Sequence, residues 1–337
     1  MKKIAVINSK SSQPKYRQLV QSVINGIEKG SFAKGQQLPS INKFATANNI
    51  AKETVTKAYS ELRELGIIIA QHGKGFYVSK TQAKIGLNIF VLFDTFNAYK
   101  EVLYNALKAA LPAGTQFSIF FHHYNVKQFA QLINDNIGSY NYYVIMPHFD
   151  MDVSAVVNTI PRDKLLLLDR DVPKLKNGYA AVFQDFENDI YNALEKGLPL
   201  IKKYSKLNLV AGYEHLQYVP AAIIKGYKRF CTTNGIAGDV IDNLKEENLS
   251  KGEAYLIFND TDLIGFIKYC DKKKWKPGKD IGLISYDDTP LKEILLGGVT
   301  VISTDFAKMG KTAGEIIVGK GLGKIANDSM FIKRKTL

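Results

Sequence analysis

The chain has 337 residues, of which 46% are hydrophobic and 23% charged, and its formal net charge is +13. This length allows two or three domains with buried cores, and two cysteines are too few for a disulfide framework. Residues 1–80 hold 13 basic and 4 acidic side chains, whereas the rest hold 32 and 28. A compact basic module indicates a polyanionic partner, nucleic acid or an anionic membrane surface, with a merely solvated basic face as the plainer alternative.

The start of the chain, MKKIAVINSK, has too short an apolar run for a signal-peptide core. No stretch approaches the ~20 apolar residues that cross a bilayer. We therefore expect a soluble cytoplasmic protein that does not interact with membranes.

The first eighty residues predict three helices followed by a hairpin. Residues 19–27 carry apolar side chains at helical spacing, and Ser40 is a suitable N-cap for a short second helix. A third helix is expected over about residues 52–65, and residues 67–79 read as two strands joined by the turn 73–75. This order is typical of a winged helix-turn-helix.

The third predicted helix turns its apolar residues inwards, so the polar residues near its N-terminus face outwards. That end of a recognition helix meets base edges in the major groove, and its free N–H groups favour a phosphate. Lysine and threonine suit both contacts, and glycine in the wing permits close approach to the sugar-phosphate backbone. For Lys43 and Lys57, phosphate positioning or plain solvation is an equally good reading. The predicted DNA-binding residues are Asn42, Lys43, Lys52, Glu53, Thr54, Thr56, Lys57, His72, Gly73 and Lys74.

Residues 10–79 resemble the DNA-binding domain of the GntR family of bacterial transcription regulators. The matching residues are Pro14, Tyr16, Gly30, Gly35, Leu38, Pro39, Ser40, Thr54, Val55, Ala58, Leu62, Gly66, Gly73 and Gly75. Two departures stand out: Asn42 and the pair Ala51-Lys52 occupy places where the family often has Arg and Ser-Arg. The resemblance implies an operator on double-stranded DNA. It does not carry over an operator sequence, because lysine lacks the guanidinium fork that reads guanine.

After a polar linker at 80–86 the pattern changes to apolar runs with helices between them. Continuous apolar runs bounded by polar turns indicate strands covered on both faces, as in a parallel α/β sheet. The runs are LNIFVLF, FSIFFHH, YYVIMP, LLLLD, AAVFQD, LNLVAGY, AYLIFND, IGLISYDD and VTVIST.

Ligands of such sheets bind beyond the carboxyl ends of the strands, so the residues that follow each run are candidates for a binding site. Polar acceptors with interleaved aromatic faces suit a sugar. Any single Asp or Asn after a strand is as often a turn former or an N-cap. The predicted effector-binding residues are Asp94, Phe96, Tyr99, His122, His148, Asp169, Arg170, Gln184, Tyr213, Asn259, Asp287 and Phe306.

Residues 86–337 resemble the effector domain of the Lac-repressor family, which is similar to type I periplasmic sugar-binding proteins. The resemblance rests on LLLLDRDV, YLIFNDTDLIGF, IGLISYDDTPL and VTVISTDFAKMGKTAGEII. It implies ligand contacts at Asp169, Asn259, Asp287 and Phe306. Ile223 departs from it, because the family often places a sugar-binding Arg there. Either Arg170 or another group takes over those contacts, or the ligand differs from the common hexoses and purines.

Together the resemblances imply an α/β protein: a winged helix-turn-helix at 1–79, a linker at 80–86, and a two-lobed domain with parallel sheets at 87–337. We assign lobe 1 to about 87–182 and 282–304, and lobe 2 to about 183–281 and 305–337. GntR heads joined to such bodies occur in sugar regulators of the arabinose-repressor type.

The expected function is a homodimeric, sugar-responsive transcription regulator, preferably a repressor, with a pentose or deoxyhexose as the guessed effector and no metal or cofactor. An enzyme is the first rival, but adjacent side chains on a strand, such as His122 and His123, point to opposite faces and make a poor metal site. The stretch 319–324 matches a nucleotide loop only loosely. A solute-binding protein would need a signal peptide, and an architectural DNA protein would not need a cleft-shaped body.

Overall fold

In the computed structural model of the chain, the described residues are 14–28, 30–79, 87–175, 178–211, 219–319, 321 and 323–337. The predicted linker at 80–86 lies outside them, and the predicted boundaries at 79 and 86 stay predictions. Residues Val91–Pro112, Ile119–Ala130 and Tyr143–Leu337 form one compact unit, and the head belongs to another, so the two are described separately. None of the described helices combines the length and apolarity that a bilayer crossing requires.

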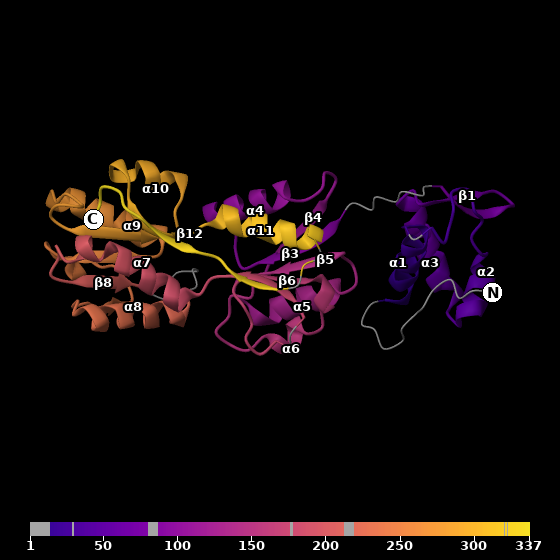
Figure 1. The fold of residues 1–337 in the computed structure, drawn as a ribbon, viewed down its shortest axis with the longest axis horizontal. Helices are drawn as coiled ribbons and strands as arrows, with labels where there is room; N and C mark the ends of the chain where they lie inside the picture. The colour runs from indigo at the N-terminus through magenta and orange to yellow at the C-terminus, as the bar shows by residue number, and fades with distance from the viewer. Residues whose placement is uncertain are drawn as a thin grey trace. The chain divides into compact units, whose positions relative to one another are not determined.

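The head consists of three helices and a two-stranded wing, as predicted. The elements in chain order are α1 (Lys15–Glu28), α2 (Ile41–Asn48), α3 (Lys52–Glu64), β1 (Ile68–Gln71) and β2 (Gly75–Val78) (Figure 1). One apolar cluster joins all three helices to the wing and includes Leu19, Phe44, Leu62 and Val78. Because these side chains repeat at helical spacing, burying one stripe of each helix leaves the polar stripe outside.

Local signals fix the turn between α2 and α3. The Ser40 side chain accepts a hydrogen bond from the backbone N–H of Lys43 at 3.3 Å, which caps α2. Asn49 ends α2 in the left-handed region at φ 52°, a conformation that Asn tolerates better than most residues. In the wing, β1 pairs antiparallel with β2, and Gly73 and Gly75 have φ of +70° and +106°. Their positive φ requires glycine at both ends of the turn.

Within its described residues the body contains two six-stranded sheets. The first has the strand order β13-β7-β6-β5-β3-β4. Its strands are β3 (Asn88–Phe93), β4 (Gln116–Phe121), β5 (Tyr142–Ile145), β6 (Leu165–Asp169), β7 (Ala180–Phe183) and β13 (Lys324–Ala326), and its helices are α4 (Ala98–Ala109), α5 (Val126–Asn136), α6 (Ser154–Val157) and α11 (Phe306–Gly319).

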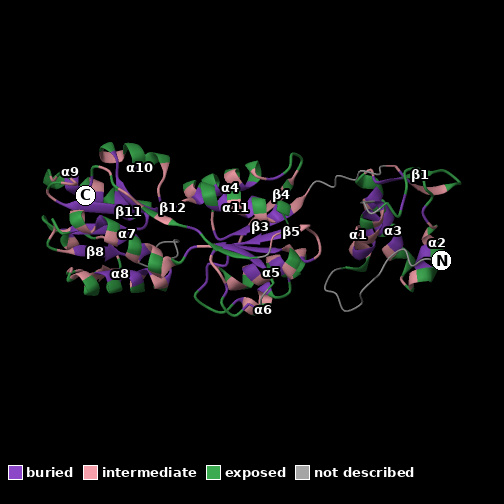
Figure 2. Cartoon of the chain, viewed as in Figure 1, coloured by how far each residue is buried: buried purple, intermediate pink, exposed green. Residues whose placement is uncertain are grey.

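The second sheet has the order β14-β12-β11-β10-β8-β9. Its strands are β8 (Leu207–Val210), β9 (Val240–Ile241), β10 (Ala254–Ile257), β11 (Gly282–Tyr286), β12 (Thr300–Thr304) and β14 (Ser329–Ile332), and its helices are α7 (Phe186–Ile201), α8 (Ala221–Asn234), α9 (Asp260–Lys273) and α10 (Pro290–Ile294). Neighbouring strands run parallel except β14, which pairs antiparallel with β12. Helices cover the sheets, so the central strands are buried, whereas β4, β9, β13 and β14 are partly or fully exposed (Figure 2). All nine apolar runs form strands, which confirms the predicted α/β class.

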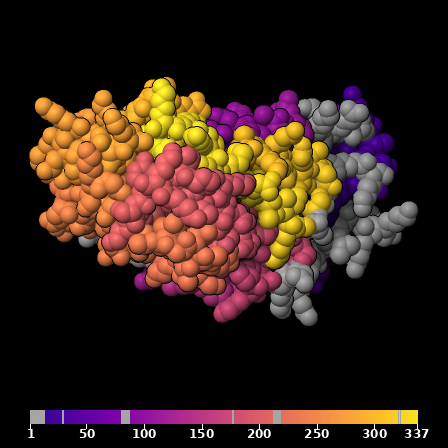
Figure 3. Space-filling view, turned by 60° about the vertical axis from the view of Figure 1, so that its left-hand side comes forward, coloured from indigo at the N-terminus to yellow at the C-terminus, as the bar shows by residue number. Residues whose placement is uncertain are grey.

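The strand order corrects the predicted assignment of strands to lobes. Strands β11 and β12, within 282–304, belong to the second sheet, whereas α11 and β13, within 305–337, belong to the first. The C-terminal segment therefore contributes to both lobes, and its yellow surface extends across them in Figure 3. The prediction failed because the sheet to which a strand belongs depends on which strand it pairs with, here β11 with β10. An apolar run does not indicate its pairing partner.

The contact between α4 and α11 gives a stability prediction. A Cβ atom on Gly310 of α11 would lie 2.2 Å from the Leu103 carbonyl oxygen and 2.9 Å from the Leu107 nitrogen of α4. Gly310→Ala must push the two helices apart, and such overpacking typically costs about 1–3 kcal/mol. We expect the melting temperature of the full chain to fall by about 5 °C, measured by calorimetry.

The matched control lies at the end of the same helix. A Cβ on Gly319 would meet nothing within 4 Å, so Gly319→Ala should leave the melting temperature unchanged or slightly raise it. Equal melting temperatures for the two variants would contradict the close helix approach.

Candidate effector pocket and nucleic-acid interface

A pocket lies at the carboxyl ends of strands from both sheets, within the unit that contains residues 143–337. Its empty space is about 400 Å³ with the open mouth included. The topology explains its composition, because the turns after parallel strands converge on one edge. The lining residues are Asp94, Tyr99, Tyr124, His148, Asp169, Gln184, Phe186, Pro220, Ile223, Phe258, Tyr286, Asp287 and Phe306.

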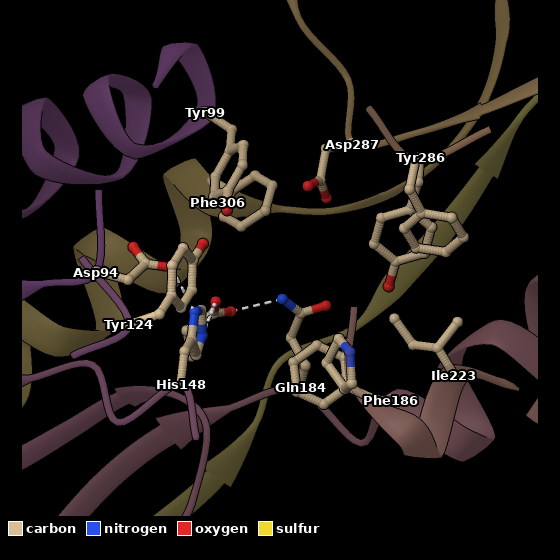
Figure 4. Close-up of a pocket in the computed structure, with 13 residues that line it drawn as sticks. Asp94, Tyr99, Tyr124, His148, Gln184, Phe186, Ile223, Tyr286, Asp287 and Phe306 are labelled. Atoms are coloured by element: carbon tan, nitrogen blue, oxygen red, sulfur yellow. Dashed lines mark hydrogen bonds and ion pairs between the residues drawn. The ribbon is translucent and has the colours of Figure 1, made fainter. Parts of the chain in front are cut away.

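A row of buried polar side chains runs along one wall of this pocket. Lys100 donates to Asp94, and the two ring nitrogens of His148 lie 2.8 Å from Asp94 Oδ2 and 2.9 Å from Asp169 Oδ2. Gln184 Nε2 donates to Asp169 Oδ1 at 2.5 Å. Figure 4 shows the contacts of His148 and Gln184 as dashed lines. The row therefore pairs each of its two carboxylates with two donors.

The row continues into the second sheet. Thr304 at the end of β12 donates to Gln184 Oε1 at 2.8 Å, and both side chains are buried. Gln184 follows β7 and Thr304 precedes α11, so the bond joins two of the places where the chain passes from one sheet to the other. A ligand that contacts Gln184 therefore touches one crossing directly and is linked to the other through the hydrogen bond from Thr304.

The charges in the row support one another. Burial lowers the pKa of the His148 imidazole, but the carboxylates of Asp94 and Asp169 outweigh burial and raise that pKa to about 9. Burial raises the pKa of Asp94, but His148 and Lys100 outweigh it and hold that pKa well below its usual range. At neutral pH the row therefore holds an imidazolium between two carboxylates.

Asp287 differs from the other two carboxyl groups of the pocket. It is 8% exposed, and its Oδ1 has no hydrogen-bond partner among the described residues. Burial raises its pKa to about 7, opposed by the charge of Lys292. Asp287 has a φ of 59°, a strained conformation of a kind that concentrates at functional sites.

Aromatic rings form the remaining walls. Tyr99 stacks on Phe306 with ring centroids 4.4 Å apart and planes at 25°, and Phe258 stacks on Tyr286 at 4.4 Å and 21°. Figure 4 shows the Asp287 side chain between Tyr99 and Phe306 on one side and Tyr286 on the other. The pocket can therefore hold a ligand that offers both polar edges and flat or apolar faces.

The lining residues include seven of the predicted effector residues. These are Asp94, Tyr99, His148, Asp169, Gln184, Asp287 and Phe306. Phe96 is 50% exposed and is not among the lining residues, and Tyr213 lies outside the described residues. Arg170 lines a different surface hollow, beside residues 147–153, where its Nη2 is 3.4 Å from Asp150 Oδ1.

Two further candidates, Asn259 and His122, make contacts within the fold and do not line the pocket. Asn259 caps α9: its side chain accepts from the Asp262 N–H at 2.7 Å and its amide donates to the Asp262 carboxylate at 2.5 Å. His122 is fully buried, with Nε2 3.1 Å from the Met146 carbonyl oxygen, and burial lowers its pKa to about 4. Neither is among the lining residues of the pocket.

Six lining residues were not in the predicted set: Tyr124, Phe186, Pro220, Ile223, Phe258 and Tyr286. Phe258 and Tyr286 each lie next to a predicted residue. At the end of β11 both Tyr286 and Asp287 line the pocket, whereas at the end of β10 Phe258 lines it and Asn259 does not. Pro220 and Ile223 lie at the start of α8, which no strand-end rule would have selected. Within the described residues, no group of three or more His, Cys, Asp or Glu side chains is placed to hold a metal ion.

The predicted DNA-binding residues lie on three parts of the head: the start of α2, α3 and the turn of the wing. Lys52 and Glu53 are exposed and Thr54 is half-buried in the first turn of α3, while Val55, Ala58 and Leu62 turn into the core. His72, Gly73 and Lys74 are exposed in the turn of the wing, and Asn42 and Lys43 are exposed at the start of α2.

Two of these side chains are already engaged within the head. Thr56 donates to the Lys52 carbonyl at 2.9 Å, and the Lys57 ammonium lies 4.2 Å from the centre of the Tyr16 ring. The Lys57 ammonium group keeps its positive charge when it lies over the ring. It can therefore still attract a phosphate.

Comparison with known proteins agrees with both parts. Residues 15–78 match the family described as bacterial regulatory proteins, gntR family. The repressor YtrA of Bacillus subtilis is 39% identical over 74 residues, 22% of this chain and 57% of YtrA. The regulator GalR of Streptococcus thermophilus is 24% identical over 181 residues, 47% of this chain and 53% of GalR. This chain thus spans less than two thirds of these relatives.

Solved structures match the body. The lactose repressor bound to an anti-inducer has a TM-score of 0.61 at 18% identity, covering 74% of this chain and 99% of that one. The trehalose repressor of Escherichia coli has a TM-score of 0.59 at 16% identity, covering 72% and 99%. At this identity the likeness establishes the fold of the body. The predicted combination of a GntR-type winged helix-turn-helix with a Lac-repressor-like α/β body is therefore confirmed, and the relatives named here are described as regulators, not as enzymes.

Proposed function

We propose that this chain, a GntR-type DNA-binding domain joined to a body with the fold of the lactose repressor's effector domain, is a transcriptional repressor that responds to a sugar. It acts in the cytoplasm as a homodimer, with one head on each half of a near-palindromic operator. YtrA and the trehalose repressor, to which parts of the chain are similar, are repressors, and this favours repression over activation. The body binds a monosaccharide in the pocket that Asp94, Gln184 and Asp287 line.

The observation that carries the proposal is a pocket at the carboxyl ends of two sheets, in a chain that also carries a basic winged helix-turn-helix domain. Hydroxyl groups of a sugar would meet Gln184 and the carboxyl group of Asp287, and its C–H faces would meet the stacked pairs of Tyr99 and Tyr286. Because Thr304 donates a hydrogen bond to Gln184, a sugar that binds Gln184 would be linked to two of the segments that connect the sheets.

The proposed coupling needs differential affinity. A ligand changes operator affinity only if it binds one arrangement of the heads more tightly than the other, and a coupling of ~1–3 kcal/mol is typical. The same coupling must raise or lower sugar affinity when operator is bound, because linkage is reciprocal.

The test begins with operator selection. The purified 337-residue chain selects bound sequences from a random double-stranded DNA pool. A monosaccharide panel is then added to the complex in a mobility-shift assay. We expect a near-palindromic consensus and release or strengthening of binding by about 5–150-fold with one sugar class. An architectural protein would show no consensus, and an enzyme or solute-binding protein would show no sugar effect on DNA.

A further inference from the structure

The three carboxyl groups that line the pocket are not equivalent. Asp94 is paired with Lys100 and His148, and Asp169 is paired with His148 and Gln184. These two carboxylates therefore need nothing from a ligand. Asp287 is also buried, like Asp94 and Asp169, yet its Oδ1 has no hydrogen-bond partner among the described residues. Leaving a buried polar atom without a partner is unfavourable, so a ligand that supplies one is favoured.

Lys292, on the helix that follows Asp287, makes no hydrogen bond to the Asp287 carboxyl group. The Lys292 ammonium donates to the backbone carbonyls of Tyr286 at 2.8 Å and of Asp287 at 2.9 Å, and it lies 3.5 Å from Asp260 Oδ1. It is 3% exposed and is not among the residues that line the pocket. Lys292 thus holds the turn beneath the carboxyl group and leaves its pocket side open.

The charge of the pocket wall selects the kind of partner. In the polar row two cations, Lys100 and His148, match two carboxylates, Asp94 and Asp169. Among the described residues no lysine or arginine lines the pocket, and Ile223 is an apolar member of the lining set. A phosphate or carboxylate on the ligand would therefore meet Asp287 without a free cation, whereas an ammonium group would neutralise it.

The aromatic walls favour the same group. The Tyr99–Phe306 and Phe258–Tyr286 pairs lie on either side of Asp287 (Figure 4). Ring faces attract cations, most strongly where water is excluded. The Tyr286 hydroxyl, which is buried and has no hydrogen-bond partner among the described residues, can accept a hydrogen bond from the same donor.

We infer that the effector of this pocket is a polyhydroxylated amine, such as an amino sugar, whose ammonium group binds the Asp287 carboxylate between the two stacked aromatic pairs. This inference rests on the proposed function, because it names the ligand class of the same pocket. Neutral sugars of the same shape bind more weakly, and acidic or phosphorylated sugars are excluded.

Isothermal titration of the full chain at pH 7 tests the ligand class. Glucosamine, galactosamine, mannosamine and 6-amino-6-deoxyglucose are each compared with the parent hexose, and the first three also with their N-acetyl forms, which keep the nitrogen without its charge. We expect at least one amine to bind about tenfold or more tightly than both neutral counterparts. The inference is overturned if no amine binds, or if every amine that binds is matched by a neutral counterpart.

The variant Asp287→Asn tests the residue. It keeps the shape of the side chain and removes the charge, so the preference for amine over parent hexose should fall by about tenfold or more. Asp328→Asn, at a carboxylate that is 77% exposed and paired with Lys308, is the matched control and should keep the preference. An unchanged preference in Asp287→Asn overturns the role of Asp287.

The two proposals fail in different ways. A neutral sugar that binds and changes operator affinity would leave the repressor standing and overturn the amine. An amine that binds through Asp287 without any change in operator affinity would support the ligand class and overturn the regulatory function.

Discussion

Asp94→Asn is expected to destabilise the body by about 3–5 kcal/mol, because the substitution leaves a buried ammonium group without its counter-ion. Lys100, one of its two charged partners, is 0% exposed, as is Asp94 itself. His148 would lose one of its two carboxylates at the same time. With ~2–4 °C per kcal/mol for a body of this size, the melting temperature of the full chain should fall by about 10 °C or more, measured by calorimetry.

Two controls separate burial from loss of charge. Asp328→Asn removes the same group from a pair with Lys308 whose side chains are 77% and 53% exposed, and an exposed pair contributes about 0–1 kcal/mol. Asp94→Asn combined with Lys100→Met removes both charges and should recover part of the lost stability, since the uncompensated charge is gone. A melting temperature for Asp94→Asn equal to that of Asp328→Asn would contradict the buried row.

The strand-end rule explains why much of the pocket was predictable. Asp94, Asp169 and Asp287 each follow an apolar run, and parallel strands bring their carboxyl ends to one edge. The rule says nothing about direction, however. Arg170 directly follows Asp169 but lines another hollow, because neighbouring side chains point to opposite sides.

Other parts of the site depend on three-dimensional context. Whether Asn259 faces a ligand or caps a helix is decided by the position of the Asp262 N–H, which follows from the start of α9. The pairing of Phe258 with Tyr286 unites residues from β10 and β11 across a register that no local pattern records. The lobe assignment of 282–304 failed for the same reason.

The head was predicted more completely because its signals are local. Apolar residues at helical spacing, the Ser40 cap and the Gly73–Gly75 turn lie within a few residues of the features that they determine. In the body, the arrangement of the site depends on contacts between residues that are far apart in the sequence, such as Gln184 and Thr304.

Lys52→Ala combined with Thr54→Ala is expected to weaken operator binding by about 100-fold or more, if each side chain contributes about 1–3 kcal/mol to phosphate or base contacts. Both lie in the first turn of α3, where the helix presents free N–H groups and the positive end of its dipole. Lys52 is exposed and does not support the core, so the head should stay folded. A mobility-shift titration against the selected operator measures the loss.

The control uses the other end of the same helix. Ser60→Ala with Arg63→Ala also removes one hydroxyl and one cation from exposed positions of α3. Because a recognition helix contacts DNA through its N-terminal part, this variant should lose far less affinity, on the order of the salt-screened effect of a single distant charge. Equal losses in the two variants would mean that net charge alone binds the DNA, and loss of ligand binding together with operator binding would indicate misfolding. Only a large loss confined to the N-terminal pair identifies α3 as the helix that reads the operator.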